Sequence, residues 1–257
     1  MRVEKWYLDC VNPAGAGMIG YAARVSIGPL ALRLSETLQW SATAAPVENR
    51  TVFGGALPKD CPEVVAWSNP SLAARGRWRP VAAAMRPLVL HEDATGRIEW
   101  TCRCPAAMVR TRIGPNLYEG PGYAERLVLT MRPDRLPLRE LRWGRFIAET
   151  QSCIWIRWRG PVERQWFFHN GREVAAGPAD PPVMDWPGHR LVLAPGRVLR
   201  SGRIADTAFG QAGWLRRLLP AAVRDLEETK WCCAGVLTDA TGRTHAGWAI
   251  HEVATFP

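Results

Sequence analysis

Apolar and polar residues alternate along most of the chain with a period of two. In residues 31–40, for example, Leu32 and Leu34 alternate with Arg33 and Ser35. This period is typical of antiparallel strands with one side in solvent, because successive side chains of a strand point to opposite faces. Glycine, proline and asparagine turn signals separate the alternating runs. The pattern predicts about a dozen short strands and an all-β fold of barrels or sandwiches.

Two segments depart from this alternation. Residues 214–226 place apolar side chains at helical spacing, which predicts one short helix near 213–226 that Pro220 bends or divides. Residues 46–80 contain five prolines and are predicted to be rich in loops.

A five-residue repeat suggests how the strands are organised. Asp93-Ala-Thr-Gly-Arg97 returns as Asp239-Ala-Thr-Gly-Arg243, each time between two extended runs. Each copy predicts a hairpin turn. One hairpin in each half favours two tandem related domains, which we place at residues 1–132 and 133–257. Chance recurrence explains the repeat equally well, because Asp, Thr and Gly are common turn formers.

Residues 118–146 join the two halves and contain an unexpected carboxylate. On a strand, Glu125 shares a face with Tyr123 and Leu127, so it is a charged residue on an apolar face. Burial raises the pKa of such a carboxyl group, which suits a general acid. A buried ion pair with Arg145 would lower that pKa instead. Both interpretations stay open, and they predict opposite titration behaviour.

The composition narrows the class of protein. The 257 residues carry a net charge of +9, but only three of the 33 basic residues are lysines and the arginines are spread over every segment. We therefore do not expect nucleic-acid binding from the charge. Neither an apolar signal core at the start nor a run of about 18 apolar residues is present. We expect a soluble, cytoplasmic protein.

Motifs for metals and nucleotide cofactors are also missing. The seven cysteines are odd in number and unevenly spaced, unlike a secreted disulfide framework. Cys102 and Cys104 on one strand face, with the adjacent Cys232 and Cys233, supply four thiols but no CxxC spacing. The histidines form no paired-ligand pattern, and no phosphate-binding loop or nucleophile elbow occurs. We expect no metal and no cofactor.

Aromatic residues are the remaining candidates. Tryptophan occurs 13 times, and several tryptophans lie on predicted strands. Aromatic faces stabilise cations and pack against long apolar ligands, although they are equally good core residues.

Four segments resemble a known family. Residues 120–127 (GPGYAERL), 136–146 (LPLRELRWGRF), 155–160 (WIRWRG) and 247–253 (GWAIHEV) look like the hydroxyneurosporene synthase (carotenoid 1,2-hydratase) and AttH-like group. The resemblance implies two tandem lipocalin-like (calycin) β-barrel domains. It also implies chemistry in which an isoprenoid double bond is protonated and water captures the cation. Tocopherol cyclase and fungal lipocalin-like pericyclases look like distant relatives that fold and cyclise an apolar substrate.

Together these features predict a cofactor-independent hydratase or cyclase acting on a hydrophobic, isoprenoid-like small molecule. Glu125 is the predicted proton donor, oriented by Tyr123 and Arg145, with Glu252 and His251 as reserve acid–base groups. The predicted substrate-binding residues are Trp143, Trp155, Trp158, Trp166, Trp248 and Phe146. Peripheral contact with a membrane is a further expectation. Two alternatives stay open, a non-catalytic carrier of lipids or terpenoids and a pericyclase on a polyketide-like substrate.

Overall fold

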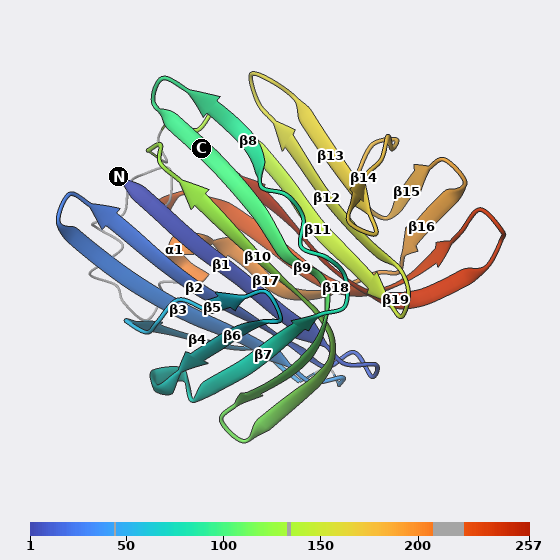
Figure 1. The fold of residues 1–257 in the computed structure, drawn as a ribbon, viewed down its shortest axis with the longest axis horizontal. Coiled ribbons are helices and arrows are strands. Elements are labelled where there is room, and N and C mark those ends of the chain that lie inside the picture. The colour runs from blue at the N-terminus through green and yellow to red at the C-terminus, as the bar shows by residue number, and fades with distance from the viewer. Residues whose placement is uncertain (44, 133–134, 208–223) are drawn as a thin grey trace. The chain divides into compact units, whose positions relative to one another are not determined.

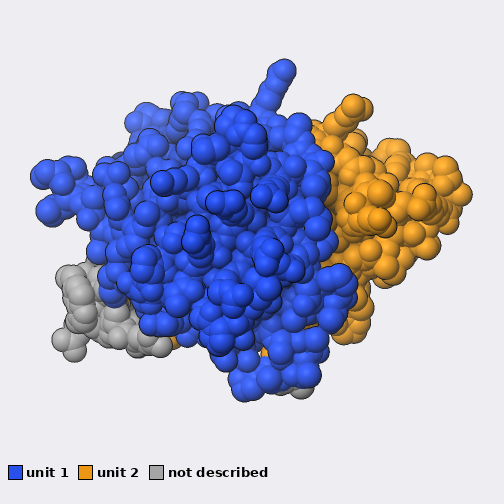
Figure 2. Space-filling model, turned by 60° about the horizontal axis from the view of Figure 1, so that its bottom comes forward, with its two compact units in different colours: residues 1–136 blue, residues 137–257 orange. Residues whose placement is uncertain are grey.

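The computed structural model describes residues 1–43, 45–132, 135–207 and 224–257. Nearly all of this is antiparallel β structure (Figure 1), which confirms the predicted all-β fold. The chain divides into two compact units, Met1–Leu136 (unit 1) and Pro137–Pro257 (unit 2), which Figure 2 colours separately. The division falls at 136/137, whereas the sequence places it at 132/133.

Unit 1 is a curled ten-stranded sheet with the order β4-β3-β2-β1-β10-β9-β7-β6-β5, in which β8 also pairs with β9. Its elements are β1 (Arg2–Val11), β2 (Gly17–Ile27), β3 (Leu30–Trp40), β4 (Glu48–Phe53), β5 (Lys59–Cys61), β6 (Val64–Asn69), the 3-10 helix η1 (Pro70–Leu72), β7 (Ala74–Pro80), β8 (Leu88–Asp93), β9 (Gly96–Ile113) and β10 (Asn116–Leu129). The first and last strands, β1 and β10, pair at its centre.

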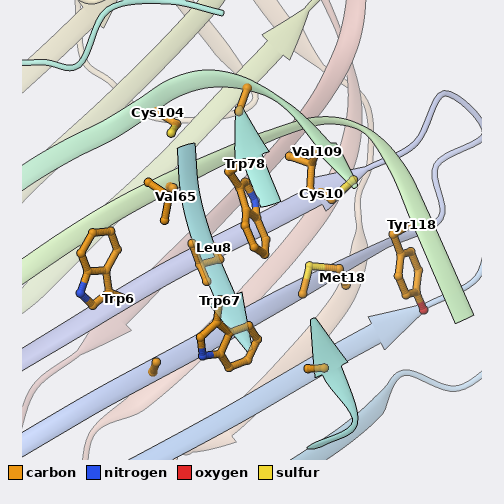
Figure 3. Packing of buried hydrophobic residues seen from close by; sticks show 14 of the residues in the cluster. Trp6, Leu8, Cys10, Met18, Val65, Trp67, Trp78, Cys104, Val109 and Tyr118 are labelled. Carbon is orange, nitrogen blue, oxygen red and sulfur yellow. The ribbon is translucent and has the colours of Figure 1, made fainter. Parts of the chain in front are cut away.

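The sheet of unit 1 curls around its own core (Figure 3). The ring of Trp67 on β6 lies against Gly20 on β2, where a Cβ atom would come within 2.7 Å of the ring. Trp78 on β7 donates from its indole Nε1 to the Asp9 carbonyl on β1, at 2.7 Å. These contacts join strands that are far apart in the sheet order, so the inner face is a closed apolar core.

Unit 2 has the order β14-β13-β12-β11-β19-β18-β16-β15, in which β17 also pairs with β18. Its elements are β11 (Glu140–Ala148), β12 (Ser152–Arg159), β13 (Arg164–His169), β14 (Arg172–Glu173), β15 (Val183–Trp186), β16 (His189–Leu193), β17 (Arg197–Arg203), the helix α1 (Ile204–Thr207), β18 (Glu227–Thr238) and β19 (Thr244–Thr255). Phe167 on β13 and Trp186 on β15 meet with ring centroids 4.8 Å apart, so this sheet also curls around a core.

The two units repeat one topology. Four consecutive strands, β1 to β4 or β11 to β14, run outward from a central pair made by the first and last strands of the unit. The short strands β8 and β17 correspond, because each pairs with the strand that precedes the last one. The Asp-Ala-Thr-Gly-Arg copies, however, occupy different turns, β8–β9 in unit 1 and β18–β19 in unit 2. The repeated turn is therefore not a mark of the duplication.

Both copies of the turn nevertheless have the same local structure. The first aspartate, Asp93 or Asp239, accepts hydrogen bonds from the backbone and hydroxyl of the threonine two residues later. These are the contacts by which aspartate forms turns generally, and they account for the recurrence.

Two local predictions need correction or lie outside the described residues. Residues 46–80 are not mainly loop, because they contain β4, β5, β6, β7 and η1. The prolines that suggested loops lie between or at the ends of these elements, as Pro62, Pro70 and Pro80 do, which are positions where β structure tolerates proline. The helix predicted near 213–226 lies almost wholly outside the described residues. Of the helices within them, none is both long and apolar enough to span a bilayer.

Candidate active site

Each sheet has a core face, which lines the core described above, and a second face that carries buried polar residues. On the second face of unit 1, residues paired across neighbouring strands form one continuous row. In the order of the strands, the row consists of Cys102 on β9, Glu125 on β10, Tyr7 on β1, Tyr21 on β2 and Glu36 on β3. We call this set the Glu125 row. Residues directly opposite each other on paired strands share a face and touch, so Glu125 lies between Cys102 and Tyr7.

Two neutral donors hold one oxygen of Glu125. Trp100 Nε1 donates to Glu125 Oε2 at 2.5 Å, and the Tyr123 hydroxyl donates to the same oxygen at 2.7 Å. Trp100 and Tyr123 are buried and Glu125 is half-buried. The contact with Tyr123 also shows that residues 123 and 125 share a face, as the alternation predicts. The two donors fix the orientation of the carboxyl group.

Tyr123 is a phenol and not a phenolate in this environment. Burial raises the pKa of Tyr123 well above its usual value, and the neighbouring Cys102 and Glu125 raise it further. Burial also raises the pKa of the Cys102 thiol. Both groups therefore keep their protons at neutral pH, and Tyr123 is available as a donor to Glu125.

Tyrosine rings continue the row beside Glu125. Tyr7 packs edge-on against Tyr21 and Tyr123, with ring centroids 5.4 Å and 6.0 Å apart. The ammonium group of Lys5 lies 5.0 Å from the centre of the Tyr21 ring. These rings offer π-faces of the kind that stabilise positive charge. Sequence reasoning missed Tyr7 and Tyr21, because Tyr7 shares its strand face with Lys5 and Asp9 and is therefore not a polar residue on an apolar face.

Unit 2 carries a corresponding row on its second face. Trp143, Glu252, Lys230 and Arg200 are paired in register across β11, β19, β18 and β17. Lys230 is fully buried and forms ion pairs with Glu252 and, at 3.7 Å, with Glu228. Its ammonium group lies 5.8 Å from the centre of the Trp143 ring.

Arg200 completes this charged group. Its guanidinium donates to Glu228 Oε1 from both Nε, at 3.0 Å, and Nη2, at 2.9 Å. Two cations and two carboxylates thus form a buried network on the second face. Sequence reasoning selected Glu252 but missed Lys230, which is one of only three lysines in the chain.

His251 and Glu252 cannot serve one site together, because neighbouring residues of β19 point to opposite faces. His251 lies on the core face, where its ring stacks on Trp231 with centroids 5.0 Å apart. Burial, helped by the charge of Lys230, lowers the pKa of His251 to about 4. The imidazole is therefore neutral at pH 7 and can accept a proton but not supply one.

The six aromatic residues predicted to bind substrate also divide between the two faces. Register places Trp143, Trp158, Trp166 and Trp248 on the second face, whereas Phe146 and Trp155 lie in the packed core. Trp158 donates from Nε1 to the Pro137 carbonyl at 2.9 Å. One cavity lined by all six is excluded, since a strand cannot direct residues of both parities to the same side.

Arg145 is buried on the second face of unit 2. Its Nη1 donates to the Trp248 carbonyl at 2.6 Å, so it bridges β11 and β19. Its pairing with Glu125 stays a prediction.

Cys102 and Cys104 lie on opposite faces of the sheet of unit 1. The register of β9 against β10 shifts between Ala124 and Glu125, which turns Cys104 into the core and leaves Cys102 beside Tyr123. The predicted shared face of these two cysteines is therefore wrong, because a bulge interrupts the alternation. Within the described ranges, no group of three His, Cys, Asp or Glu side chains is arranged to hold a metal ion.

Two hollows lie elsewhere. One of about 170 Å³ in unit 1 is lined by Arg2, Glu4, Arg24 and Ser26, and one of about 430 Å³ in unit 2 by Gln165, Phe167, Glu173, Val174, Ala175 and Ala176. Neither lining includes Glu125. The candidate site therefore depends on its hydrogen bonds and not on a measured cavity.

Comparison with known proteins gives the fold but no family by sequence. No family model and no curated protein matches the chain. Three solved structures are similar over nearly all of it at 9% sequence identity: a protein provisionally named AttH from Nitrosomonas europaea (TM-score 0.54; 98% of this chain and 92% of that one), CghA (0.57; 99% and 88%), and kievitone hydratase from Nectria haematococca (0.57; 98% and 88%). The chain has the AttH-like fold expected from the resemblance, and identity this low shows the fold alone.

Proposed function

We propose that this protein is an enzyme of the hydratase or cyclase type, in which Glu125 protonates an alkene of an apolar substrate. The observation that carries the proposal is the pair of neutral donors, Trp100 Nε1 and Tyr123 OH, that converge on Glu125 Oε2. In a neutral carboxylic acid the carbonyl-type oxygen accepts hydrogen bonds and the other oxygen carries the proton. With Oε2 held as the acceptor, Oε1 is the atom that would deliver the proton.

Protonation of an alkene leaves a carbocation that needs stabilisation. The rings of Tyr7 and Tyr21 continue the row beside Glu125, and their π-faces can interact with positive charge. Water would then capture the cation in a hydration, or a second double bond would attack it in a cyclisation. In the hydration, the bound water loses a proton to the Glu125 carboxylate. In the cyclisation, the attack leaves a new carbocation, which loses a proton from a neighbouring carbon to the same carboxylate, and both routes restore the acid without a cofactor.

Glu125 suits this role better than the reserve residues. Glu252 is ion-paired with the buried Lys230, which favours the ionised carboxylate, and an ionised carboxylate has no proton to donate. His251, with its pKa lowered to about 4, is neutral and lies against Trp231 on the other face of β19. For Trp143, whose ring centre lies 5.8 Å from the Lys230 ammonium group, we propose a structural role in unit 2 in place of substrate binding.

The fold supports the proposed class of reaction. One similar structure is a kievitone hydratase and therefore, by its name, adds or removes water. We propose an isoprenoid-like substrate because the second-face residues near Glu125 are aromatic and the proposed chemistry begins at an alkene. A cytoplasmic location and independence from cofactors belong to the same proposal.

Replacement of Glu125 by Gln tests the proposal. Glutamine keeps the shape and the acceptor oxygen but cannot supply the proton, so turnover of a panel of isoprenoid alkenes should fall by about 10²-fold or more. Glu119→Gln is the matched control, because Glu119 lies exposed on the same strand and pairs with Arg110 at the surface. Tyr123→Phe removes one donor and should reduce turnover less than Glu125→Gln does.

The outcomes separate the alternatives. Full activity of Glu125→Gln on a substrate that the wild type converts would end the proton-donor proposal. Binding of the panel by the wild type without any product, followed by mass spectrometry, would identify a carrier instead. Conversion of polyketide-like polyenes that survives Glu125→Gln would favour the pericyclase alternative, because a pericyclic step needs no proton donor.

A further inference from the structure

The fold gathers arginines that are scattered in the sequence onto one surface of unit 1. Strand β7 reads Ala-Arg-Gly-Arg-Trp-Arg-Pro, and its arginines at 75, 77 and 79 are exposed while the residues between them are buried. On the neighbouring strand β9, Arg110 and Arg112 are exposed in the same alternation. β7 and β9 lie side by side (Figure 1), so these residues share the outer face. We call the five residues the arginine face.

The arginines are placed directly opposite one another. Register pairs Arg75 with Arg112 and Arg77 with Arg110. Like charges at directly opposite positions destabilise a sheet. Arg75, Arg77 and Arg79 form no ion pair with any described residue, and Arg110 pairs with Glu119 at 2.8 Å. The five arginines and Glu119 sum to +4 (5 − 1). A biased composition accounts for many arginines, but not for the collection of five on one face with a single ion-paired carboxylate.

We infer that the arginine face docks onto the surface of an anionic lipid bilayer. Basic residues near such a surface are attracted to its charged headgroups. Apolar residues stand among the arginines, since Met108, opposite Arg79, is 56% exposed and Leu117, opposite Arg112, is 42% exposed. Exposed aliphatic side chains beside cations match the boundary between headgroups and acyl chains.

A single-stranded nucleic acid fits this surface less well. Proteins that bind single strands combine basic grooves with aromatic side chains on which the bases stack. The aromatic residues of β7 and β9 are Trp78, which packs in the core, and Trp100, which donates to Glu125 on the second face, and both are buried. The described residues of these two strands therefore expose arginines and methionine but no stacking platform.

Vesicle co-sedimentation tests the inference with the full chain. The wild type should bind phosphatidylcholine vesicles that contain phosphatidylserine, should release as salt is raised, and should not bind vesicles of phosphatidylcholine alone. The variant Arg75→Glu with Arg77→Glu should bind at least about 25-fold more weakly, at roughly fivefold for each arginine lost. It should fold normally, because each new glutamate faces an arginine across the sheet. Far-ultraviolet circular dichroism and the urea midpoint of unfolding, compared with those of the wild type, check that the variant folds.

The matched control is Arg172→Glu with Arg243→Glu, two exposed positions in unit 2. Both double variants lower the net charge from +9 to +5 (9 − 4), so they separate location from total charge. Equal loss in the control, or equal binding to uncharged vesicles, would overturn the inference. Tighter binding of a homopolymeric single-stranded RNA than of the anionic vesicles, at the same salt, would also overturn it. None of these outcomes depends on the proposed chemistry at Glu125.

Discussion

At the scale of single residues, titratable groups of the same type lie in different environments. Glu125 accepts from an indole and a phenol, whereas Glu252 is ion-paired with a buried lysine. His251 lies against Trp231 on the core face, next in sequence to Glu252 but on the other side of the strand. Chemistry at these positions is therefore set by the atoms that surround each group and not by the residue type.

His251 should make stability depend on pH in a defined window. Its pKa is lowered from 6.5 to about 4 in the folded chain, so the unfolded state binds more protons between these values. The contribution of neutral His251 to the free energy of unfolding is therefore fully present above about pH 6.5. It decreases as the pH drops toward 4, by about 3 kcal/mol at most. Urea unfolding at pH 7.5 and at pH 4.5 measures this change in the free energy of unfolding. His251→Gln should show a smaller loss over this window, and an equal loss would assign the dependence to other groups.

Replacing Lys230 alone should lower the stability of the protein strongly. A buried carboxylate left without its cation destabilises by about 3–5 kcal/mol, so Lys230→Met should lower the free energy of unfolding by about that amount. The double variant Lys230→Met with Glu252→Leu removes both charges and should recover most of the loss. Glu119→Gln, at an exposed ion pair, should change stability by less than about 1 kcal/mol. Equal effects of Lys230→Met and Glu119→Gln would contradict the buried network.

At the scale of elements, the site is made by register between strands. Tyr7, Glu125 and Cys102 come from β1, β10 and β9 and meet because these strands pair at those positions. Unit 2 has the same kind of cross-strand pairing, in which Trp143 on β11, Glu252 on β19 and Lys230 on β18 lie opposite one another. In each unit the last strand supplies the glutamate at the centre of the sheet.

Gly144 shows how closely neighbouring strands pack on the core face. A Cβ atom there would lie 2.2 Å from the Trp155 ring and 2.7 Å from the Cβ of His251. Gly144→Ala should therefore destabilise by about 1–3 kcal/mol through overpacking. Gly177→Ala is the control, because its added Cβ would meet only the Asp185 carbonyl at 3.5 Å. Urea midpoints of the two variants compare them, and similar midpoints would mean that β11 shifts to accept the methyl group.

At the scale of the whole molecule, the duplication lies in the order of strands. The two units share a topology, while the one visible sequence repeat falls at turns that do not correspond. The fold also shows that part of the net charge of +9 is concentrated on one surface. Arginines that look evenly spread along the chain come together on β7 and β9, which a count per segment cannot reveal.

The sequence alone determined the all-β class, the hairpins around both repeated turns, and the shared face of Tyr123 and Glu125. These features are local, because a period of two and turn residues act over a few positions. The sequence places the domain boundary at 132/133, and the two compact units divide at 136/137, between β10 and β11.

Only the tertiary structure decided which strands are neighbours. β1 pairs with β10 across more than a hundred residues of chain, and that pairing brings Tyr7 to Glu125. A bulge in β9 separates Cys102 from Cys104, and strand register joins Lys230 to Glu252. Pairing and register depend on how an entire sheet closes around its core. Alternation within one strand predicts which residues share a face, but it does not predict what that face meets.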